Sequence, residues 1–128
     1  MSIHVVHIED DSMLRDILQI SFQVADPEIR LKQYTNGDDA IPYIEQNGQT
    51  IDLFILDIRL PGSLNGLQIA QKIRAMNCPG HLVLTSAYSS PSREWLSSLS
   101  GEYFPKPWHI LDLTRKLLQY RLDSAAQV

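Results

Sequence analysis

The stretch from Asp52 to Gly66, DLFILDIRLPGSLNG, carries the clearest signal of fold in the chain. Its first part, Asp52–Asp57, is a short apolar run, which is typical of a strand that is buried on both faces. The residues from Leu60 to Asn65 are of the kinds that favour turns. The stretch therefore predicts a central strand that ends at a carboxylate, Asp57, and is followed by a loop.

Similar apolar runs alternate with helical patterns on both sides of this stretch. Further strands are predicted over Ile3–Ile8, Ile29–Tyr34, His81–Ser86 and Tyr103–Phe104. Helices are predicted over Ser12–Val24, Asp38–Gln46, Leu67–Met76, Pro91–Leu99 and Ile110–Leu122. Alternating strands and helices indicate a parallel sheet with helices on both faces, and right-handed crossovers favour a doubly wound arrangement. The fold class is therefore α/β, with a doubly wound five-stranded parallel sheet.

Two of the predicted helices carry more detailed expectations. In the first helix, an apolar stripe predicts the buried face; it consists of Leu14, Ile17, Leu18 and Phe22. In the second helix, Pro42 is expected to confine the regular part, because proline removes a backbone donor.

Length and composition set limits on the class of protein. The 128 residues suffice for one domain, expected over residues 1–122, with a tail over residues 123–128. A net charge of −4 offers no electrostatic footprint for nucleic acid or an anionic membrane. No apolar run has the length of a membrane span, and no export signal follows Met1, so the expected location is the cytoplasm.

Polar and charged residues stand at the carboxyl ends of four of the five predicted strands. They are Glu9, Asp10 and Asp11 after the first strand, Asp57 at the end of the third, Thr85 and Ser86 at the end of the fourth, and Lys106 after the fifth. Each has a structural explanation when taken alone; Asp10, Asp11 or Ser12, for example, could cap the first helix. Sites in such sheets form beyond the carboxyl ends of the strands, however, so their joint occurrence predicts one shared site.

The combination of residue types indicates phosphoryl chemistry. Crowded carboxylates raise one another's pKa and need a cation, and a hard ion such as Mg²⁺ prefers oxygen ligands. An Asp carboxylate can attack a phosphoryl group to give an acyl phosphate. An ammonium and a hydroxyl can then neutralise and bind the phosphoryl oxygens.

These residues resemble the receiver domain of two-component signalling, in its CheY-like form, over essentially the whole chain. The matching stretches are Val5–Arg15 (VVHIEDDSMLR), Asp52–Gly66, Leu82–Ala87 (LVLTSA) and Tyr103–Trp108 (YFPKPW). The resemblance implies a flavodoxin-like (βα)5 fold with strand order 2-1-3-4-5. It implies Asp57 as phosphoacceptor, and a Mg²⁺ ion held by Asp10, Glu9, Asp57 and the backbone carbonyl of Arg59. It further implies Lys106 as the phosphate-binding lysine, a cis peptide before Pro107, and Ser86 and Tyr103 as switch residues.

The same resemblance implies a function. The chain would accept a phosphoryl group from a sensor histidine kinase or a histidine phosphotransfer protein. It would act as a signalling switch that catalyses only its own phosphorylation and dephosphorylation, not as an enzyme with an external substrate. The fourth helix, fifth strand and fifth helix would bind a downstream protein or a second copy. Because no output domain follows residue 122, the chain either acts alone or is a fragment of a longer regulator.

Three positions depart from the family pattern. The loop from Pro61 to Gly66 is one residue longer than usual. The hydroxyl after the fourth strand is ambiguous: the family pattern of a hydroxyl followed by a small residue selects Ser86, with Thr85 as the alternative, and only one of the two can face the phosphate. The interval from Ser86 to Lys106 is shorter than usual, so the fourth helix is expected to be clipped or partly irregular.

Other functions fit the sequence less well. A haloacid-dehalogenase-type enzyme would need a second Asp two residues after the nucleophile, where this chain has Arg59. A nucleotide- or flavin-binding domain would need a glycine-rich turn after the first strand, where this chain has acidic residues. A receiver that serves only as a constitutive interaction module would usually lack one of the acidic, hydroxyl or lysine residues.

Overall fold

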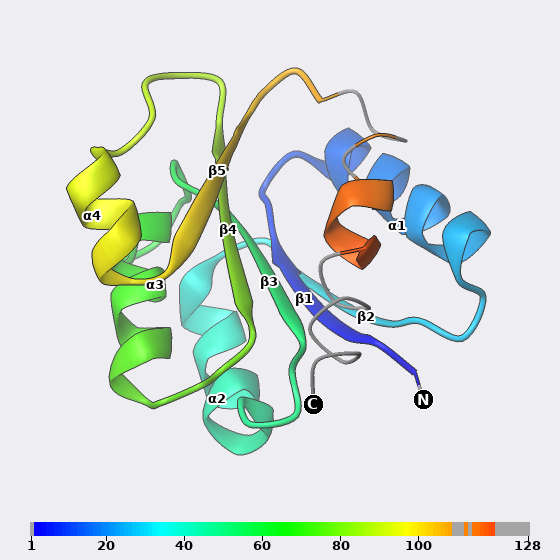
Figure 1. Cartoon of the computed structure of the whole chain (residues 1–128), viewed down its shortest axis with the longest axis horizontal. Helices are drawn as coiled ribbons and strands as arrows, with labels where there is room; N and C mark the ends of the chain where they lie inside the picture. Colours follow the sequence, from blue (N-terminus) through cyan, green and yellow to red (C-terminus); the bar gives the residue numbers. More distant parts are fainter. Residues whose placement is uncertain (1, 109–111, 113, 120–128) are drawn as a thin grey trace.

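The computed structural model describes residues 2–108, 112 and 114–119. Strands and helices alternate along the chain (Figure 1). The strands are β1 (His4–Ile8), β2 (Arg30–Tyr34), β3 (Leu53–Asp57), β4 (His81–Ser86) and β5 (Gly101–Pro105). The helices are α1 (Ser12–Ala25), α2 (Gly37–Asn47), α3 (Gly66–Ala75) and α4 (Arg93–Ser98). Residues 112 and 114–119 are also helical.

The strands form one parallel sheet in the order β2-β1-β3-β4-β5. This confirms the predicted fold class and strand order. β3 lies at the centre, paired with β1 on one side and β4 on the other. Its five residues are all buried, as its apolar sequence predicts.

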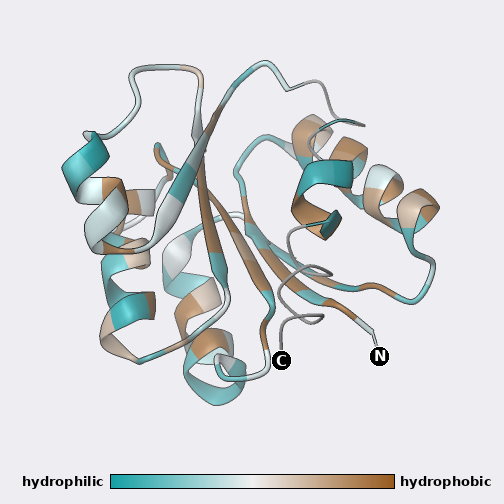
Figure 2. Cartoon of the chain, viewed as in Figure 1, coloured by the Kyte–Doolittle hydropathy of each residue, from teal (hydrophilic) through white to brown (hydrophobic). Residues whose placement is uncertain are grey.

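Two apolar layers hold the helices against the sheet. The side chains of β3 alternate between them, because successive residues of a strand point to opposite faces. Leu53 and Ile55 pack on the side of α1, whereas Phe54 and Leu56 pack on the side of α2 and α3. In Figure 1 the helical segment 114–119 lies on the α1 side, and α4 lies on the side of α2 and α3. The strands between these layers are predominantly apolar (Figure 2).

The buried face of α1 differs from the predicted stripe. Leu18 and Phe22 are fully buried, and Leu14 is half-buried, as expected. Ile17 is 37% exposed, however, so its inclusion in the buried face is wrong. One reason is that α1 packs on a single face of a twisted sheet. The sheet therefore covers a narrower arc of the helix surface than the arc that the four residues of the predicted stripe occupy.

Pro42 does not interrupt α2, which runs from Gly37 to Asn47 through the proline. The expected limit on the regular part of this helix is therefore wrong. Proline removes one backbone donor, and the helix is held by its packed residues Ala40 and Ile44. Asn36 caps its first turn by accepting from the Asp39 N–H.

The fourth helix is short, as predicted, with six residues from Arg93 to Ser98. Ser92 caps its start by accepting from the Trp95 N–H at 3.1 Å. Arg74 of α3 fixes its end: the guanidinium donates to the carbonyl oxygens of Leu99 at 2.5 Å and Gly80 at 3.0 Å. β5, from Gly101 to Pro105, is longer than the predicted Tyr103–Phe104.

Part of the predicted last helix lies outside the described residues, as do Leu122 and the predicted tail over residues 123–128. Within the described part of the chain, no helix combines the length and apolar character that a bilayer crossing requires.

The packing of the core can be tested by comparing the loss of a buried isoleucine with the loss of an exposed one. Ile55→Ala should lower the free energy of unfolding by about 2–5 kcal/mol, because it removes a fully buried side chain from β3. Ile20→Ala should change it by less than about 0.5 kcal/mol, because Ile20 is 62% exposed on α1. Urea unfolding followed by circular dichroism measures both. Equal losses in the two variants would contradict this packing.

Candidate functional site

Three carboxylates meet at the carboxyl ends of β1 and β3. Glu9 and Asp10 directly follow β1, and Asp57 is the last residue of β3. Each offers an oxygen, and these oxygens lie within 4.8 Å of one another. Glu9 and Asp57 are buried, whereas Asp10 is exposed at the edge of the cluster. The structure thus brings the predicted acidic residues together in a set that could hold a metal ion.

The third acidic residue of the run has a structural role. Asp11 is the N-cap of α1, and its carboxylate accepts from the backbone N–H groups of Met13 at 2.9 Å and Leu14 at 3.4 Å. Its own backbone N–H donates to Glu9 Oε2 at 3.3 Å. The capping alternative therefore applies to Asp11, and it leaves Glu9 and Asp10 for the cluster.

Lys106 supplies the ammonium group of the site from the loop after β5. Its Nζ lies 2.6 Å from Glu9 Oε1 and 3.4 Å from Asp57 Oδ2. Its backbone N–H donates to the Ser86 carbonyl at 2.9 Å, which fixes the loop against the end of β4. The peptide before Pro107 is cis, as predicted.

Burial opposes the ionisation of the carboxylates in this cluster. It raises the pKa of Glu9 to about 7, and the charge of Asp57 adds to the rise while Lys106 opposes it. Burial also raises the pKa of Asp57, again against the effect of Lys106. One ammonium therefore does not compensate the carboxylates, even at the short distance from Lys106 to Glu9. A cation added to the cluster would favour the ionised forms.

The two hydroxyls at the end of β4 make different contacts. Thr85 Oγ1 accepts from the indole Nε1 of Trp108 at 2.7 Å, in the layer that also contains α1. Ser86 Oγ accepts from the backbone N–H of Tyr88 at 3.0 Å, in the loop that leads to α4. The Thr85 hydroxyl is thus part of a packing contact, whereas the Ser86 hydroxyl belongs to the loop beside the site. This favours Ser86 over Thr85 as the predicted switch hydroxyl.

Tyr103 of β5 lies half-buried against the same loop. Its hydroxyl donates to the carbonyl oxygens of Ser86 at 3.1 Å and Tyr88 at 3.0 Å. The ring packs on the layer that contains α3 and α4. The predicted switch tyrosine is therefore bonded to the backbone of the loop that carries the predicted switch hydroxyl.

The loop after β3, which the family resemblance predicts to be one residue longer than usual, is bonded to α2. Gly62 adopts a left-handed φ of 94°, which glycine accepts without strain. Ser63 then reaches α2: its backbone N–H donates to Asp38 Oδ2 at 3.0 Å and its hydroxyl to Asp38 Oδ1 at 2.5 Å. The longer loop is thereby pinned to the first turn of α2. Nearer the site, the Arg59 N–H donates to Asp57 Oδ1 at 3.4 Å.

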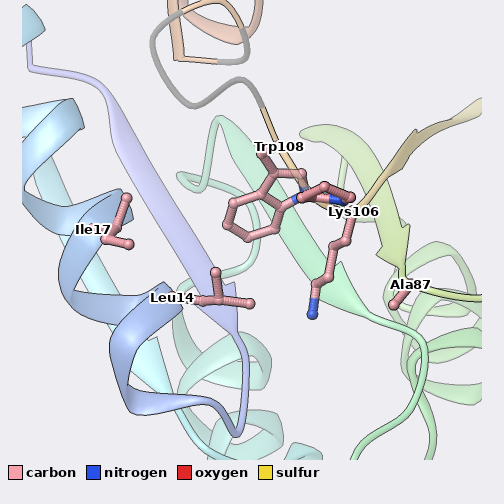
Figure 3. Close-up of a pocket in the computed structure, with 6 residues that line it drawn as sticks. Leu14, Ile17, Ala87, Lys106 and Trp108 are labelled. Atoms are coloured by element: carbon pink, nitrogen blue, oxygen red, sulfur yellow. The ribbon is translucent and has the colours of Figure 1, made fainter.

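A hollow of about 500 Å³ lies beside Lys106. Its lining residues are Leu14, Ile17, Ala87, Lys106, Pro107 and Trp108. In Figure 3 the Lys106 side chain extends between Leu14 of α1 and Ala87 of the loop after β4. The partial exposure of Ile17 is explained by this hollow, since Ile17 is one of its lining residues.

Sequence reasoning missed three side chains that support the site. Arg15 Nη1 donates to the Glu9 carbonyl at 2.7 Å, which holds the acidic loop against α1. Trp108 binds Thr85, and Arg59 stacks on Tyr88 with 3.6 Å between its Cζ and the ring centroid. Of these, only Arg15 had a usable signal, a basic residue one helical turn after the capping Asp11. The others depend on contacts between separate loops.

A family model, the response regulator receiver domain, matches residues 5–118. The chain is 31% identical over 111 residues to the sensory transduction protein LytT of Oceanobacillus iheyensis, covering 84% of this chain and 44% of that protein. It is 28% identical over 127 residues to the TorCAD operon transcriptional regulatory protein TorR of Escherichia coli, covering 97% of this chain and 53% of TorR. The chain spans between about a fifth and about a half of the length of the curated relatives that it matches.

Among solved structures, the fold is similar to that of a CheY-like response regulator receiver domain protein from Methanospirillum hungatei. The TM-score is 0.85 at 15% identity, and the match covers 100% of both chains.

The raised pKa of Glu9 predicts a pH dependence of stability in metal-free protein. Between the ordinary value of 4.5 and about 7, the folded protein holds a proton on Glu9 that the unfolded chain releases. The contribution of Glu9 to the free energy of unfolding therefore falls as the pH rises from 4.5 to about 7. Burial lowers the pKa of His7 to about 3. The contribution of His7 to the free energy of unfolding therefore rises with pH between about 3 and 6.5.

Glu9→Gln isolates the Glu9 effect, because it keeps the shape of the side chain and removes its titration. Urea unfolding in EDTA, compared at about pH 5 and about pH 7.5, should show a larger loss of stability, or a smaller gain, in the parent than in Glu9→Gln. Identical pH dependence in the two proteins would contradict the raised pKa.

Proposed function

The chain belongs to the response regulator receiver domain family, and we propose that it accepts a phosphoryl group on Asp57 in the presence of Mg²⁺. As a receiver domain it is a signalling switch of two-component signalling. The observation that carries the proposal is the placement of Lys106 Nζ within 3.4 Å of Asp57 and 2.6 Å of Glu9, beside the exposed Asp10.

The transfer uses Asp57 as the nucleophile. A carboxylate oxygen of Asp57 forms a bond to phosphorus while the bond from phosphorus to the donor nitrogen of a phosphohistidine breaks, and the electron pair returns to that imidazole. Lys106, already between Glu9 and Asp57, neutralises charge on the phosphoryl oxygens. The Ser86 hydroxyl donates to one of these oxygens and exchanges its contact with the Tyr88 N–H for it.

The donor set of the cluster fits Mg²⁺, because all three side chains offer carboxylate oxygens and one of them is open to solvent. Asp10, Asp57, Glu9 and the backbone carbonyl of Arg59 would hold the ion, with Asp10 the more direct ligand. The ion would offset the carboxylate charge and bind phosphoryl oxygens. Arg15 contributes by holding the Glu9 carbonyl, and hence the acidic loop, against α1.

We further propose that the phosphorylated state acts through α4, β5 and the last helix. The path starts at Ser86 and reaches β5 through the Tyr103 hydroxyl, which is bonded to the Ser86 and Tyr88 carbonyls. Phosphorylation shifts the population between two arrangements of this loop. The proposed donor is a sensor histidine kinase or histidine phosphotransfer protein in the cytoplasm, and the proposed target is a downstream protein or a second copy, with no direct contact to nucleic acid or membrane.

Acetyl phosphate or beryllofluoride should modify the protein at Asp57 only when Mg²⁺ is present, because the crowded carboxylates resist a further anion without a cation. Asp57→Asn should abolish labelling. Asp10→Asn should weaken Mg²⁺ binding by about tenfold or more, as loss of a ligand does. Mass spectrometry locates the label, and titration of Trp fluorescence measures the Mg²⁺ affinity.

Asp11→Asn is the matched control for Asp10→Asn, since Asp11 caps α1 and asparagine is an equally good cap. It should label normally. Labelling that persists in EDTA, or that maps to another residue, would exclude this mechanism.

Removing the hydroxyl of Ser86 or of Thr85, and following the response of β5, tests which of the two is the switch hydroxyl. Ser86→Ala should still be phosphorylated, but beryllofluoride should no longer change the hydrogen exchange of β5 around Tyr103, because the link from phosphate to loop is gone. Thr85→Ala should keep that response and lower stability by about 1–3 kcal/mol, because it leaves the half-buried Trp108 indole without its acceptor. The reverse pattern would assign the switch to Thr85.

A further inference from the structure

The half-buried ring of Trp108, in the loop after β5, is packed on one side and borders the hollow on another. Its indole N–H donates to Thr85 Oγ1 at 2.7 Å, and its ring centroid lies 6.2 Å from that of the buried His7. In Figure 3 the ring points from the Lys106 turn toward α1. Because the hollow of about 500 Å³ leaves room for the ring to turn, the hydrogen bond to Thr85 fixes its orientation more than close packing does.

The bond to Thr85 is one of two anchors of the loop that carries Lys106. The first anchor is the Lys106 backbone N–H, which donates to the Ser86 carbonyl at 2.9 Å. The second is the Trp108 indole, two residues further on. Thr85 is fully buried, so this second bond is shielded from water, which strengthens it. The loop is thus bonded on both sides of the Lys106 side chain to the last two residues of β4.

The Lys106 side chain depends on these anchors, because it is long and borders the same hollow. A lysine loses more side-chain freedom than most residues when its ammonium is fixed at one place. Here Nζ lies 2.6 Å from Glu9 Oε1 and 3.4 Å from Asp57 Oδ2. It also lies 5.7 Å from the centroid of the Trp108 ring, which is within the range of a cation–π attraction. The position of the ring therefore bears on the position of the ammonium as well as on that of the loop.

We propose that Trp108, through its hydrogen bond to Thr85, is a positioning residue that holds the Lys106 ammonium at the phosphoacceptor Asp57. The inference rests on the proposed function of Asp57. Neither Trp108 nor Thr85 touches the reacting atoms, since Thr85 points to the face of β4 opposite that of Ser86. Without the bond, the ring turns into the hollow and the loop loosens. The ammonium then lies beside Asp57 for less of the time, so it neutralises less of the charge on the phosphoryl oxygens during transfer.

The rate of labelling by acetyl phosphate at saturating Mg²⁺ tests this role. Trp108→Phe keeps an aromatic ring and removes the donor, whereas Thr85→Val keeps the shape of the side chain and removes the acceptor. Each should lower the rate constant for labelling of Asp57 by about tenfold, because a displaced ammonium is a misplaced catalytic group. The double variant should be no slower than the slower single variant, because both changes remove the same bond. Thr85→Ser keeps the hydroxyl and should restore the parental rate.

The Mg²⁺ affinity separates a displaced ammonium from a general loosening of the site. The ammonium repels a cation that binds to the same carboxylates, so its displacement should tighten Mg²⁺ binding by about fivefold in Trp108→Phe and in Thr85→Val. Loosened carboxylates would instead bind Mg²⁺ less tightly. In a Lys106→Ala background, Trp108→Phe should leave the affinity unchanged, because the charge through which it acts is gone. Isothermal titration calorimetry measures all of these affinities.

Two controls accompany these measurements. In NMR spectra, the indole N–H proton of Trp108 should lie downfield and exchange slowly in the parent and in Thr85→Ser, and should lose both features in Thr85→Val. Ile3→Val is the stability control, because it removes a methylene group from the same apolar layer just before β1, at the opposite end of the sheet. It should lower the melting temperature and keep the parental labelling rate and Mg²⁺ affinity.

Parental labelling rates in Trp108→Phe and Thr85→Val would overturn the role of Trp108, as would slower labelling with unchanged or weaker Mg²⁺ binding. A tightening of Mg²⁺ binding that persists without Lys106 would overturn it too. In each of these cases, labelling of the parent at Asp57 leaves the proposed function intact. A parent protein that takes no label at Asp57 would instead overturn the proposed function, and the role of Trp108 with it.

Discussion

The ion pairs of the Lys106 ammonium with two buried carboxylates are the interaction on which the site depends. It lies between Glu9 and Asp57, two carboxylates that are almost fully removed from solvent, and burial opposes the charge on both. Three strands bring these groups together from positions far apart in the sequence. Without the ammonium, the carboxyl ends of β1 and β3 would hold adjacent buried charges with no compensation. The ion cluster therefore depends on the parallel sheet, which brings its three residues together.

The cluster is nevertheless electrostatically incomplete. One ammonium faces the carboxylates of Glu9, Asp10 and Asp57. Burial, together with the charge of Asp57, raises the pKa of Glu9 in spite of Lys106. A bound cation would offset this excess of negative charge, which is the physical reason why the proposed phosphoryl transfer to Asp57 would need one. The same imbalance costs stability in the metal-free protein, which is a common feature of functional sites.

The loops beyond the strands connect the cluster to the rest of the molecule through backbone contacts. The Lys106 N–H and the Tyr103 hydroxyl both donate to the Ser86 carbonyl, so the loop after β5 and the side chain of Tyr103 are both bonded to the last residue of β4. At the far end of α4, the Arg74 guanidinium fixes the chain at Leu99. The loop before α4 is thus held beside the site by hydrogen bonds of Tyr88 to Ser86 and Tyr103, whereas the chain after α4 is anchored by Arg74. In the proposed switch, movement at the site would therefore be directed to the start of α4 and to β5.

The sequence by itself determined the fold class, the strand order through its family resemblance, and the residues of the acidic cluster. It could do so because apolar periodicity is local and because the carboxyl ends of parallel strands share one edge. It misplaced Ile17, since exposure depends on how closely a helix sits on a twisted sheet. The residue types alone left Asp10, Asp11 and Ser12 as possible caps of α1, and only the family resemblance selected Glu9 and Asp10 for the cluster and Ser86 over Thr85. Only the tertiary structure showed that Asp11 is the cap of α1, that the Thr85 hydroxyl is bonded to Trp108, and that Arg59 stacks on Tyr88. Such contacts join segments whose separation and orientation are set by the packing of the whole sheet.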